Sequence, residues 1–244
     1  MNKHTDFNIT DLNEEIGNVD ALIIPGTRNT ILDTIELKNS GKADEIIKLS
    51  ERIPIIGICG GYQMLGNNIY DEFNKESQKG TIKGLGLLNI DSQFERKEKV
   101  VKQSEAILAN EIIENYGNNK KDNIGKIFNK IGGEKITGYE LHEGTTILNG
   151  SLPLLKIKKG IGNNENSTFD GAVEKNVIGT YFHGIFHNYN FRREFLNYIR
   201  KQKGIPINNG LDPYETNKDL NIEKLAKIVE ENVDMNYIDK LLFE

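Results

Sequence analysis

The single cysteine of the chain, Cys59, lies in a stretch whose residue types favour nucleophilic chemistry. It follows the apolar run Ile55–Ile58, has Gly57 two positions before it, and is followed directly by Gly60 and Gly61. Gly-x-Cys-Gly-Gly after a buried strand is the thiol form of the nucleophile elbow, a strand-to-helix turn so sharp that only glycine leaves room around it. The first N–H groups of the following helix favour the thiolate, so we expect a lowered pKa for Cys59. A free cysteine is more often a small buried hydrophobe, but the flanking glycines favour the nucleophile here.

A thiol nucleophile also needs a general base, and His183 is the best-placed histidine. It ends the apolar run Val177–Phe182 and is followed by Gly184. Ligands of open α/β sheets bind beyond the carboxyl ends of the strands, so we expect Cys59 and His183 to meet there. The position at a strand end favours His183 over the other three histidines, which are His4, His142 and His187.

Acyl chemistry at the thiol needs two backbone N–H groups aimed at the developing oxyanion. The N–H of Gly60 is one candidate. The loop Pro25–Thr30 follows the neighbouring predicted strand Ala21–Ile24, and its backbone offers a second donor from Gly26 or Thr27. We therefore predict an oxyanion hole formed by these two segments.

The elements that must position these groups follow one another from Ala21 onward. The sequence predicts helices over residues 31–37 and 43–50, a strand over Ile53–Ile58, the elbow, and a helix of about two turns through Leu65. Ile46, Ile47 and Leu49 are expected on the inner side of the second helix. Alternating strands and helices predict an α/β fold with a doubly wound, mostly parallel, flavodoxin-like sheet.

The remaining chain is less regular. The pattern predicts a polar loop at 71–83, strands opening at 84–88 and at 94–101, a surface insertion at about 103–133, a strand at 136–142, short strands at 152–157 and 171–172 around a mobile loop at 160–167, and helices near 188–200 and 222–229. The predicted organisation is a polar N-terminal segment 1–18, one domain over 19–205, and a loop with a helical tail over 206–244.

Composition limits the function classes. The chain has 244 residues, 27% of them charged, and a formal net charge of −5, which does not suit nucleic-acid binding through bulk electrostatics. One cysteine cannot form an internal disulfide, which favours a reducing compartment. The apolar runs are far shorter than the roughly 20 residues of a membrane span. We expect a cytoplasmic protein with neither nucleic acid nor membrane as a partner.

Together the motifs resemble the class I, or triad, glutamine amidotransferase domain, in the branch that belongs to cobyric acid synthase. The resemblance covers about Val19 to Leu241 and rests on five segments in order: Leu22–Thr30, Gly57–Gly66, Gly84–Leu88, Gly138–His142 and Gly179–Phe186. The Pro25–Thr30 loop and the Asn188–Arg200 helix are most similar to that branch.

The resemblance implies that glutamine is hydrolysed through a γ-glutamyl thioester on Cys59, with His183 as general base and Gln63 along the bound glutamine. Ammonia would pass to an ATP-binding synthetase domain or subunit, where peripheral carboxylates of adenosylcobyrinic acid a,c-diamide are phosphorylated and amidated. The partners implied are L-glutamine, that synthetase, and the corrinoid through it. ATP and Mg²⁺ belong to the synthetase, so no cofactor and no metal are expected in this chain.

The sequence departs from the family pattern in two ways. The commoner triad enzymes have a glutamate two residues after the histidine, where this chain has Ile185. Glu140 or Glu143 could serve as the third member instead, although we expect either to lie on a solvated face. No phosphate loop is present, and only Ala21–Ile24 predicts a strand before the Pro25 loop. We therefore expect an N-terminally clipped domain, either a piece of a split or truncated gene or a stand-alone glutaminase subunit, with a partner at this sheet edge.

Two alternatives remain. The amidotransferase subunit of lipid II isoglutaminyl synthase, which pairs with a Mur-ligase-like partner, has a similar size and elbow, but the Pro25–Thr30 loop argues against it. A non-catalytic remnant acting as an interaction protein is the other. The intact Cys59, His183 and Gln63 argue against that reading.

Overall fold

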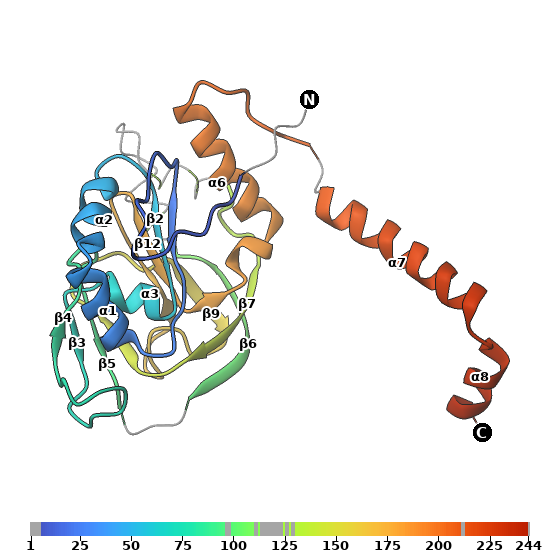
Figure 1. Ribbon diagram of the computed structural model, residues 1–244, viewed down its shortest axis with the longest axis horizontal. Coiled ribbons are helices and arrows are strands. Elements are labelled where there is room, and N and C mark those ends of the chain that lie inside the picture. Colours follow the sequence, from blue (N-terminus) through green and yellow to red (C-terminus); the bar gives the residue numbers. More distant parts are fainter. Residues whose placement is uncertain are drawn as a thin grey trace. The chain divides into compact units, whose positions relative to one another are not determined.

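The computed structural model describes residues 6–95, 99–109, 112, 124, 127, 130–210 and 213–243. The chain divides into two compact units, residues 1–207 and 208–244. All strands of the described residues lie in the first unit (Figure 1). No helix in the described part of the chain is long and apolar enough to cross a membrane.

A four-stranded sheet forms the centre of the first unit, in the order β1-β2-β12-β11. Its strands are β1 (Leu22–Ile24), β2 (Ile55–Ile58), β12 (Val177–Thr180) and β11 (Ala172–Glu174). β1 and β12 both run parallel to β2, and β11 is antiparallel to β12. The parallel arrangement brings the carboxyl ends of β1, β2 and β12 to one edge, which is where the elbow and its neighbours were expected.

Helices cover both faces of this sheet. They are α1 (Thr30–Asn39) and α2 (Lys42–Ser50) near the start of the chain, and α6 (Tyr189–Gln202) after the last strand. Successive residues of a strand point to opposite faces. Ile55 accordingly packs in a cluster with residues of α2, while Ile56 packs with Phe191 and Phe195 of α6. The helices α2 and α6 lie on opposite sides of the sheet (Figure 1). The doubly wound α/β class predicted from the sequence is confirmed.

Two further sheets flank the central one. The five-stranded sheet has the order β10-β9-β6-β7-β13 and is antiparallel throughout. Its strands are β10 (Phe169–Asp170), β9 (Leu155–Lys159), β6 (Val100–Leu108), β7 (Ile136–His142) and β13 (Phe182–His183). The four-stranded sheet β4-β3-β5-β8 comprises Ile82–Lys83, Asn68–Tyr70, Ile90–Gln93 and Thr145–Leu148. The predicted strand ending at His183 is therefore two strands, which belong to different sheets and meet at Tyr181.

The predicted surface insertion at 103–133 is wrong at its beginning. Residues 103–108 lie in β6, between β7 and β9 in the middle of the five-stranded sheet. Ser104, Ala106 and Leu108 are buried at alternate positions, so Glu105 and Ile107 between them mark the outer face of a half-buried strand. Ile112, Ile124, Ile127 and Ile131 are also buried in the core, and the residues between them lie largely outside the described part.

Three smaller predictions also need correction. Residues 84–88 form an irregular segment, because Gly84 packs against the Gly66 backbone, and the strand begins only at Ile90. Phe94 and Glu95 are not in a strand, residues 96–98 lie outside the described part, and β6 begins at Val100. Ile47 is 36% exposed, because Ala43, Ile46 and Leu49 form the inner face of α2.

The second unit consists of two helices, where the sequence indicated one. They are α7 (Pro213–Asn232) and α8 (Met235–Phe243). Apolar residues of both helices are exposed to solvent, among them Leu225, Ile228 and Leu241.

Candidate active site

The turn at Cys59 has the geometry of a nucleophile elbow. Cys59 follows β2 directly and precedes α3 (Gly60–Met64), with φ 55° and ψ −114°. These angles are strained for any residue with a side chain. The glycines explain how the strain is tolerated: a Cβ on Gly61 would overlap the carbonyl of Ile24, and one on Gly57 would lie 2.5 Å from a methyl carbon of Leu65. The helix that follows is one short segment of five residues rather than two turns.

Cys59, His183 and Gly26 lie around one point, as the sequence predicted. A Cβ placed on Gly26 would lie 3.2 Å from Cys59 Cβ, 3.7 Å from its Sγ and 3.4 Å from His183 Cε1. Three segments, each at the end of a strand, therefore meet where a substrate carbonyl could reach the sulfur. A side chain at residue 26 would therefore crowd both reacting groups, which favours glycine at this position.

The thiol of Cys59 is protected from ionisation. Burial raises its pKa, the N–H of Gly60 and the charge of Lys99 lower it, and the charge of Glu76 raises it again, with a net rise. The thiol donates a hydrogen bond to the carbonyl oxygen of Leu141, with 3.4 Å between Sγ and O. The expectation of a lowered pKa is therefore wrong, because burial outweighs the effect of N–H groups at so short a helix.

His183 is partly buried, and burial lowers its pKa. A hydrogen bond to the Leu141 carbonyl acts in the opposite direction, while the charges of His142 and Lys99 lower the pKa further. In the part of the chain that the structure describes, the Nε2 atom of His183 has no hydrogen-bond partner. The two shifts favour a neutral thiol beside a neutral imidazole whose Nε2 is free to accept a proton.

The two predicted oxyanion-hole segments touch each other. A Cβ on Gly60 would lie 3.2 Å from the backbone nitrogen of Thr27. The hydroxyl of Thr27 is hydrogen-bonded to Asp33 in α1, and it accepts a bond from the N–H of Asn29 at 3.3 Å. The loop is thus fixed beside the elbow, while the role of Gly26, Thr27 and Gly60 as donors to an oxyanion stays a prediction.

Gln63 is 2% exposed, and both ends of its amide bond to protein groups. Its Oε1 accepts from the hydroxyl of Thr30 at 3.0 Å, and its Nε2 donates to the Glu143 carbonyl at 2.9 Å and to the Tyr181 hydroxyl at 3.1 Å. These bonds brace the elbow against α1 and the turn after β7. The expected position along bound glutamine stays a prediction.

The two carboxylates considered as third members lie in different environments. Glu143 is partly exposed and pairs with Lys75 at 3.4 Å. Glu140 is fully buried, so the expectation of a solvated face is wrong for it. It accepts hydrogen bonds from the Ser104 hydroxyl, from Nε2 of His142 at 3.4 Å, and from the N–H groups of Ile161 and Gly162 at 3.0 and 2.8 Å. Burial raises its pKa, but these bonds together outweigh burial and lower it.

Glu76 is a site residue that sequence reasoning missed. It lies in the predicted polar loop 71–83, which Asp71 folds by accepting N–H bonds from Lys75, Glu76 and Ser77 at 2.6 to 2.9 Å. The Glu76 carboxylate accepts from the N–H of Ile31 at 3.1 Å, at the start of α1. Burial raises its pKa to about 7, and its charge acts on Cys59. The available sequence signal for an ordered loop was an aspartate at its start, because aspartate side chains accept bonds from the N–H groups of the residues that follow.

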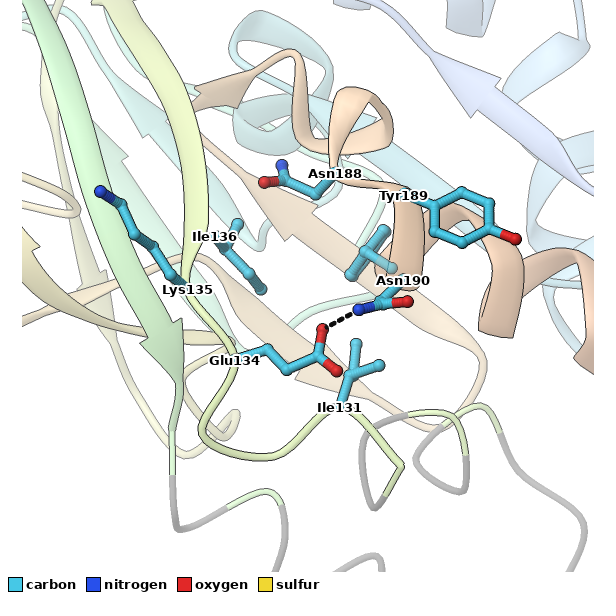
Figure 2. A pocket seen from close by; sticks show the side chains of 8 residues that line it. Ile131, Glu134, Lys135, Ile136, Asn188, Tyr189 and Asn190 are labelled. Carbon is cyan, nitrogen blue, oxygen red and sulfur yellow. Dashed lines mark hydrogen bonds between the residues drawn. The ribbon is translucent and has the colours of Figure 1, made fainter. Parts of the chain in front are cut away.

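No group of three or more His, Cys, Asp or Glu side chains that could hold a metal ion occurs among the described residues. A cavity of about 110 Å³ lies elsewhere, between the start of β7 and the start of α6 (Figure 2). Glu134 and Asn190 are hydrogen-bonded across it at 2.6 Å. Ile136, the first residue of β7, lines this cavity. Leu141 is five residues further along β7, roughly 17 Å away at 3.3–3.4 Å per residue. This cavity is therefore separate from the Cys59 site.

Known proteins resemble the chain in sequence and in fold. A family model described as the CobB/CobQ-like glutamine amidotransferase domain matches residues 2–191. A probable cobyric acid synthase of Methanosphaera stadtmanae is 47% identical, over 99% of this chain and 48% of its own length. One of Methanothermobacter thermautotrophicus is 46% identical, over 96% of this chain and 44% of its own. The chain thus spans about half the length of these relatives. The structure of PurLQS from Thermotoga maritima shares the fold, with a TM-score of 0.51 and 19% identity over 79% of this chain and 84% of that one.

Proposed function

Because the chain belongs to the CobB/CobQ-like glutamine amidotransferase domain family, we propose that its own reaction is glutamine hydrolysis through a thioester on Cys59. The observation that carries the proposal is the meeting of the Cys59 thiol and the His183 ring at Gly26, on a strained elbow. A structural cysteine has no need of this strain, whereas a nucleophile gains exposure to its substrate from it.

The reaction follows from the free Nε2 of His183. The sulfur of Cys59 attacks the γ-carboxamide carbon of glutamine while its proton passes to Nε2. Negative charge on the carboxamide oxygen is stabilised by the N–H of Gly60 and by that of Gly26 or Thr27. Nε2 then returns the proton to the leaving nitrogen, and ammonia departs as the C–N bond breaks. Water attacks the thioester with the help of the same Nε2, which releases glutamate and restores the thiol.

The neutral state of the pair fits this order of events. A thiol whose pKa is raised is protonated in the free enzyme, and an imidazole whose pKa is lowered is neutral. The thiolate therefore forms as the bond to the substrate carbon forms, where its charge moves onto the oxyanion. A thiol held in this way is also less open to oxidation before glutamine arrives.

Glu76 is the group that we expect to bind the α-ammonium of glutamine. Its charge reaches Cys59, and its bonds to the start of α1 fix its position. The carboxylate needs a positive partner in a partly buried site, and the substrate brings one. Gln63 is the second group proposed along the substrate, through the loop and turn that its amide holds together.

The ammonia is proposed to serve cobyric acid synthesis. Two relatives of high identity are named probable cobyric acid synthase, which supports this route over lipid II isoglutaminyl synthase. In it, an ATP-binding synthetase domain or subunit with Mg²⁺ amidates peripheral carboxylates of adenosylcobyrinic acid a,c-diamide, and we expect this chain itself to need no cofactor or metal. β1 is an outer strand of its sheet, and its free edge is where we expect the synthetase half to dock.

A glutaminase assay tests the proposal directly. Glutamate release from L-glutamine is measured for the purified chain alone and after addition of the synthetase half with ATP, Mg²⁺ and corrinoid. Mass spectrometry of acid-quenched protein looks for a γ-glutamyl adduct on Cys59. We expect an adduct and a turnover that rises with the synthetase half. Absence of both glutamate release and the adduct in the complete mixture would reject the proposal.

A further inference from the structure

Among the residues that the structure describes, no carboxylate is hydrogen-bonded to His183 as one is to the histidine of a catalytic triad. Two residues further along the chain stands Ile185, which is 1% exposed and packs in the hydrophobic core. Nevertheless, a catalytic imidazole needs a partner at its second nitrogen, because that partner fixes both the tautomer and the direction of the ring. The structure has to supply this partner from elsewhere.

Strand β7 contacts both reacting side chains. It pairs antiparallel with β13, so that Tyr139 lies opposite His183 and Glu140 opposite Phe182. The Tyr139 ring stacks on the His183 imidazole, with 4.9 Å between the ring centroids and 12° between the planes. Two residues later, the Leu141 carbonyl accepts the Cys59 thiol hydrogen bond, and the same main-chain group interacts with His183. The carbonyl and the ring of one strand therefore define where thiol and imidazole stand.

The Glu140 side chain lies on the other face of β7 and links this strand to neighbouring segments. Its carboxylate bonds to Ser104 on the neighbouring strand β6, to His142 on β7 itself, and to the N–H groups of Ile161 and Gly162. These last two lie in the loop 160–167, which the sequence indicated to be mobile, and Glu140 holds its first turn. His142 stacks on the buried Tyr181 ring at 3.8 Å between centroids.

Placing an ionised carboxylate at a fully buried position is unfavourable unless its oxygens are well bonded. A merely structural contact between β6 and β7 could have been apolar at the same volume. Glu140 instead ties three segments to the residue directly before Leu141. This arrangement makes sense if the position of the Leu141 carbonyl has to be held closely.

We propose that the main-chain carbonyl of Leu141 orients His183 in place of a triad carboxylate, and that Glu140 is the positioning residue that holds this carbonyl through β7. The inference rests on the proposed roles of Cys59 and His183. Its chemical consequence is a neutral partner at Nδ1, which fixes the tautomer and leaves Nε2 as the base without adding a negative charge beside the ring.

The tautomer of His183 tests the first half without any variant of β7. ¹⁵N NMR of histidine-labelled protein, free of glutamine and assigned with His183→Asn, distinguishes Nδ1–H from Nε2–H. We expect the Nδ1–H form to predominate above the pKa of His183, and a predominant Nε2–H form would overturn the proposal. This reading does not depend on turnover. A protein with the expected tautomer but no glutaminase activity would therefore reject the proposed function and keep the geometry.

Glu140→Gln tests the second half, since it keeps the volume and removes the charge. We expect kcat to fall between about tenfold and a hundredfold, as for outer partners of functional histidines, with KM changed less than about threefold. The tautomer signal should become mixed. Glu105→Gln is the matched control, because Glu105 lies on β6 beside Ser104 but is partly exposed and pairs with Lys135. It should keep wild-type kcat and tautomer.

Tyr139 supplies a variant that leaves the buried network untouched, because its ring is 43% exposed. Tyr139→Phe should retain kcat through the stacked ring, whereas Tyr139→Ala should lower kcat and broaden the His183 signal. If Glu140→Gln does not fold, the two Tyr139 variants and the wild-type tautomer still test whether β7 orients His183. Loss of kcat in Glu143→Gln with a wild-type Glu140→Gln would overturn the proposal in favour of Glu143.

Discussion

The elbow at Cys59 and strand β7 hold the two reacting side chains by different physical means. The elbow uses shape: Gly57 and Gly61 remove side chains where the backbone of α3 packs on β1 and β2, and Cys59 takes up the strain. Strand β7 uses polar bonds, with a buried carboxylate at Glu140 and a main-chain carbonyl at Leu141. One region is sensitive to an added methyl group, and the other to a lost charge.

The difference bears on how each side chain can move during the reaction. The sulfur is fixed by covalent geometry at a turn that has no freedom to relax. The imidazole is held by a stacked ring and by the main-chain group of Leu141, so it can shift slightly as Nε2 takes and returns a proton. A rigid nucleophile beside a more adjustable base suits a two-step acyl transfer, in which only the base changes its partner between steps.

Removing the nucleophile should have the largest effect. Cys59→Ser keeps the side-chain shape, but a hydroxyl does not form the thioester at neutral pH, so we expect turnover to fall by about 10⁴-fold or more. Glutamate release and the mass of the quenched protein measure this loss. The thermal midpoint should stay near that of the wild type, and near-normal glutaminase activity in the variant would reject Cys59 as the nucleophile.

Removing the base should cost less, because the elbow and oxyanion donors remain. His183→Asn should lower kcat by about 10²–10⁴-fold, the usual contribution of general acid–base catalysis. His187 is the matched control, since it lies four residues away and is exposed. His187→Asn should retain wild-type kcat. If the control were the more damaging change, the assignment of His183 would be wrong.

These two residues were predictable because their signals are local. The glycines around Cys59 report a close packing of backbone on backbone, and the apolar run before His183 reports a strand end. The order of strand, helix and elbow likewise made the α/β class predictable. Each of these inferences needed fewer than about ten neighbouring residues, which is the range over which steric and periodic patterns operate.

Glu140 and Glu76 could not be placed in this way. Glu140 is buried because Ser104, Ile161 and Gly162 meet around it, and these lie 36 positions before it and 21 and 22 positions after it. The loop that carries Glu76 is ordered by Asp71, but the carboxylate of Glu76 is positioned by the start of α1, more than forty residues earlier. A glutamate in an alternating or polar stretch normally indicates a solvated face. The insertion predicted at 103–133 failed for the same reason, because the polar residues Gln103 and Glu105 on the outer face of β6 concealed its buried positions.

Substituting Glu76 should act on glutamine binding more than on chemistry. Glu76→Gln can still accept the N–H of Ile31 but cannot neutralise an ammonium group, so we expect KM to rise about tenfold to a hundredfold. The fall in kcat should stay within about threefold, since Glu76 does not take part in proton transfer. Steady-state kinetics at pH 8 separate the two parameters. A variant with normal KM and low kcat would show that Glu76 belongs to the catalytic pair instead.

The pH dependence should give the smallest but most discriminating effect. Burial lowers the pKa of His183, so the neutral base is lost only below its ordinary value of about 6.5, and kcat should fall only there. Burial raises the pKa of Glu76 to about 7, so its carboxylate is already half protonated at neutrality and glutamine binding weakens as the pH falls through 7.

The acid limb of kcat/KM, which reports the free enzyme, should therefore begin near pH 7 and steepen at lower pH, while the acid limb of kcat lies at lower pH. Glu76→Gln should remove the limb near 7 and leave that of kcat unchanged. A raised pKa of Cys59 places the alkaline limit above about 8.5. Coincident acid limbs for kcat and kcat/KM in the wild type would show that Glu76 does not bind the substrate.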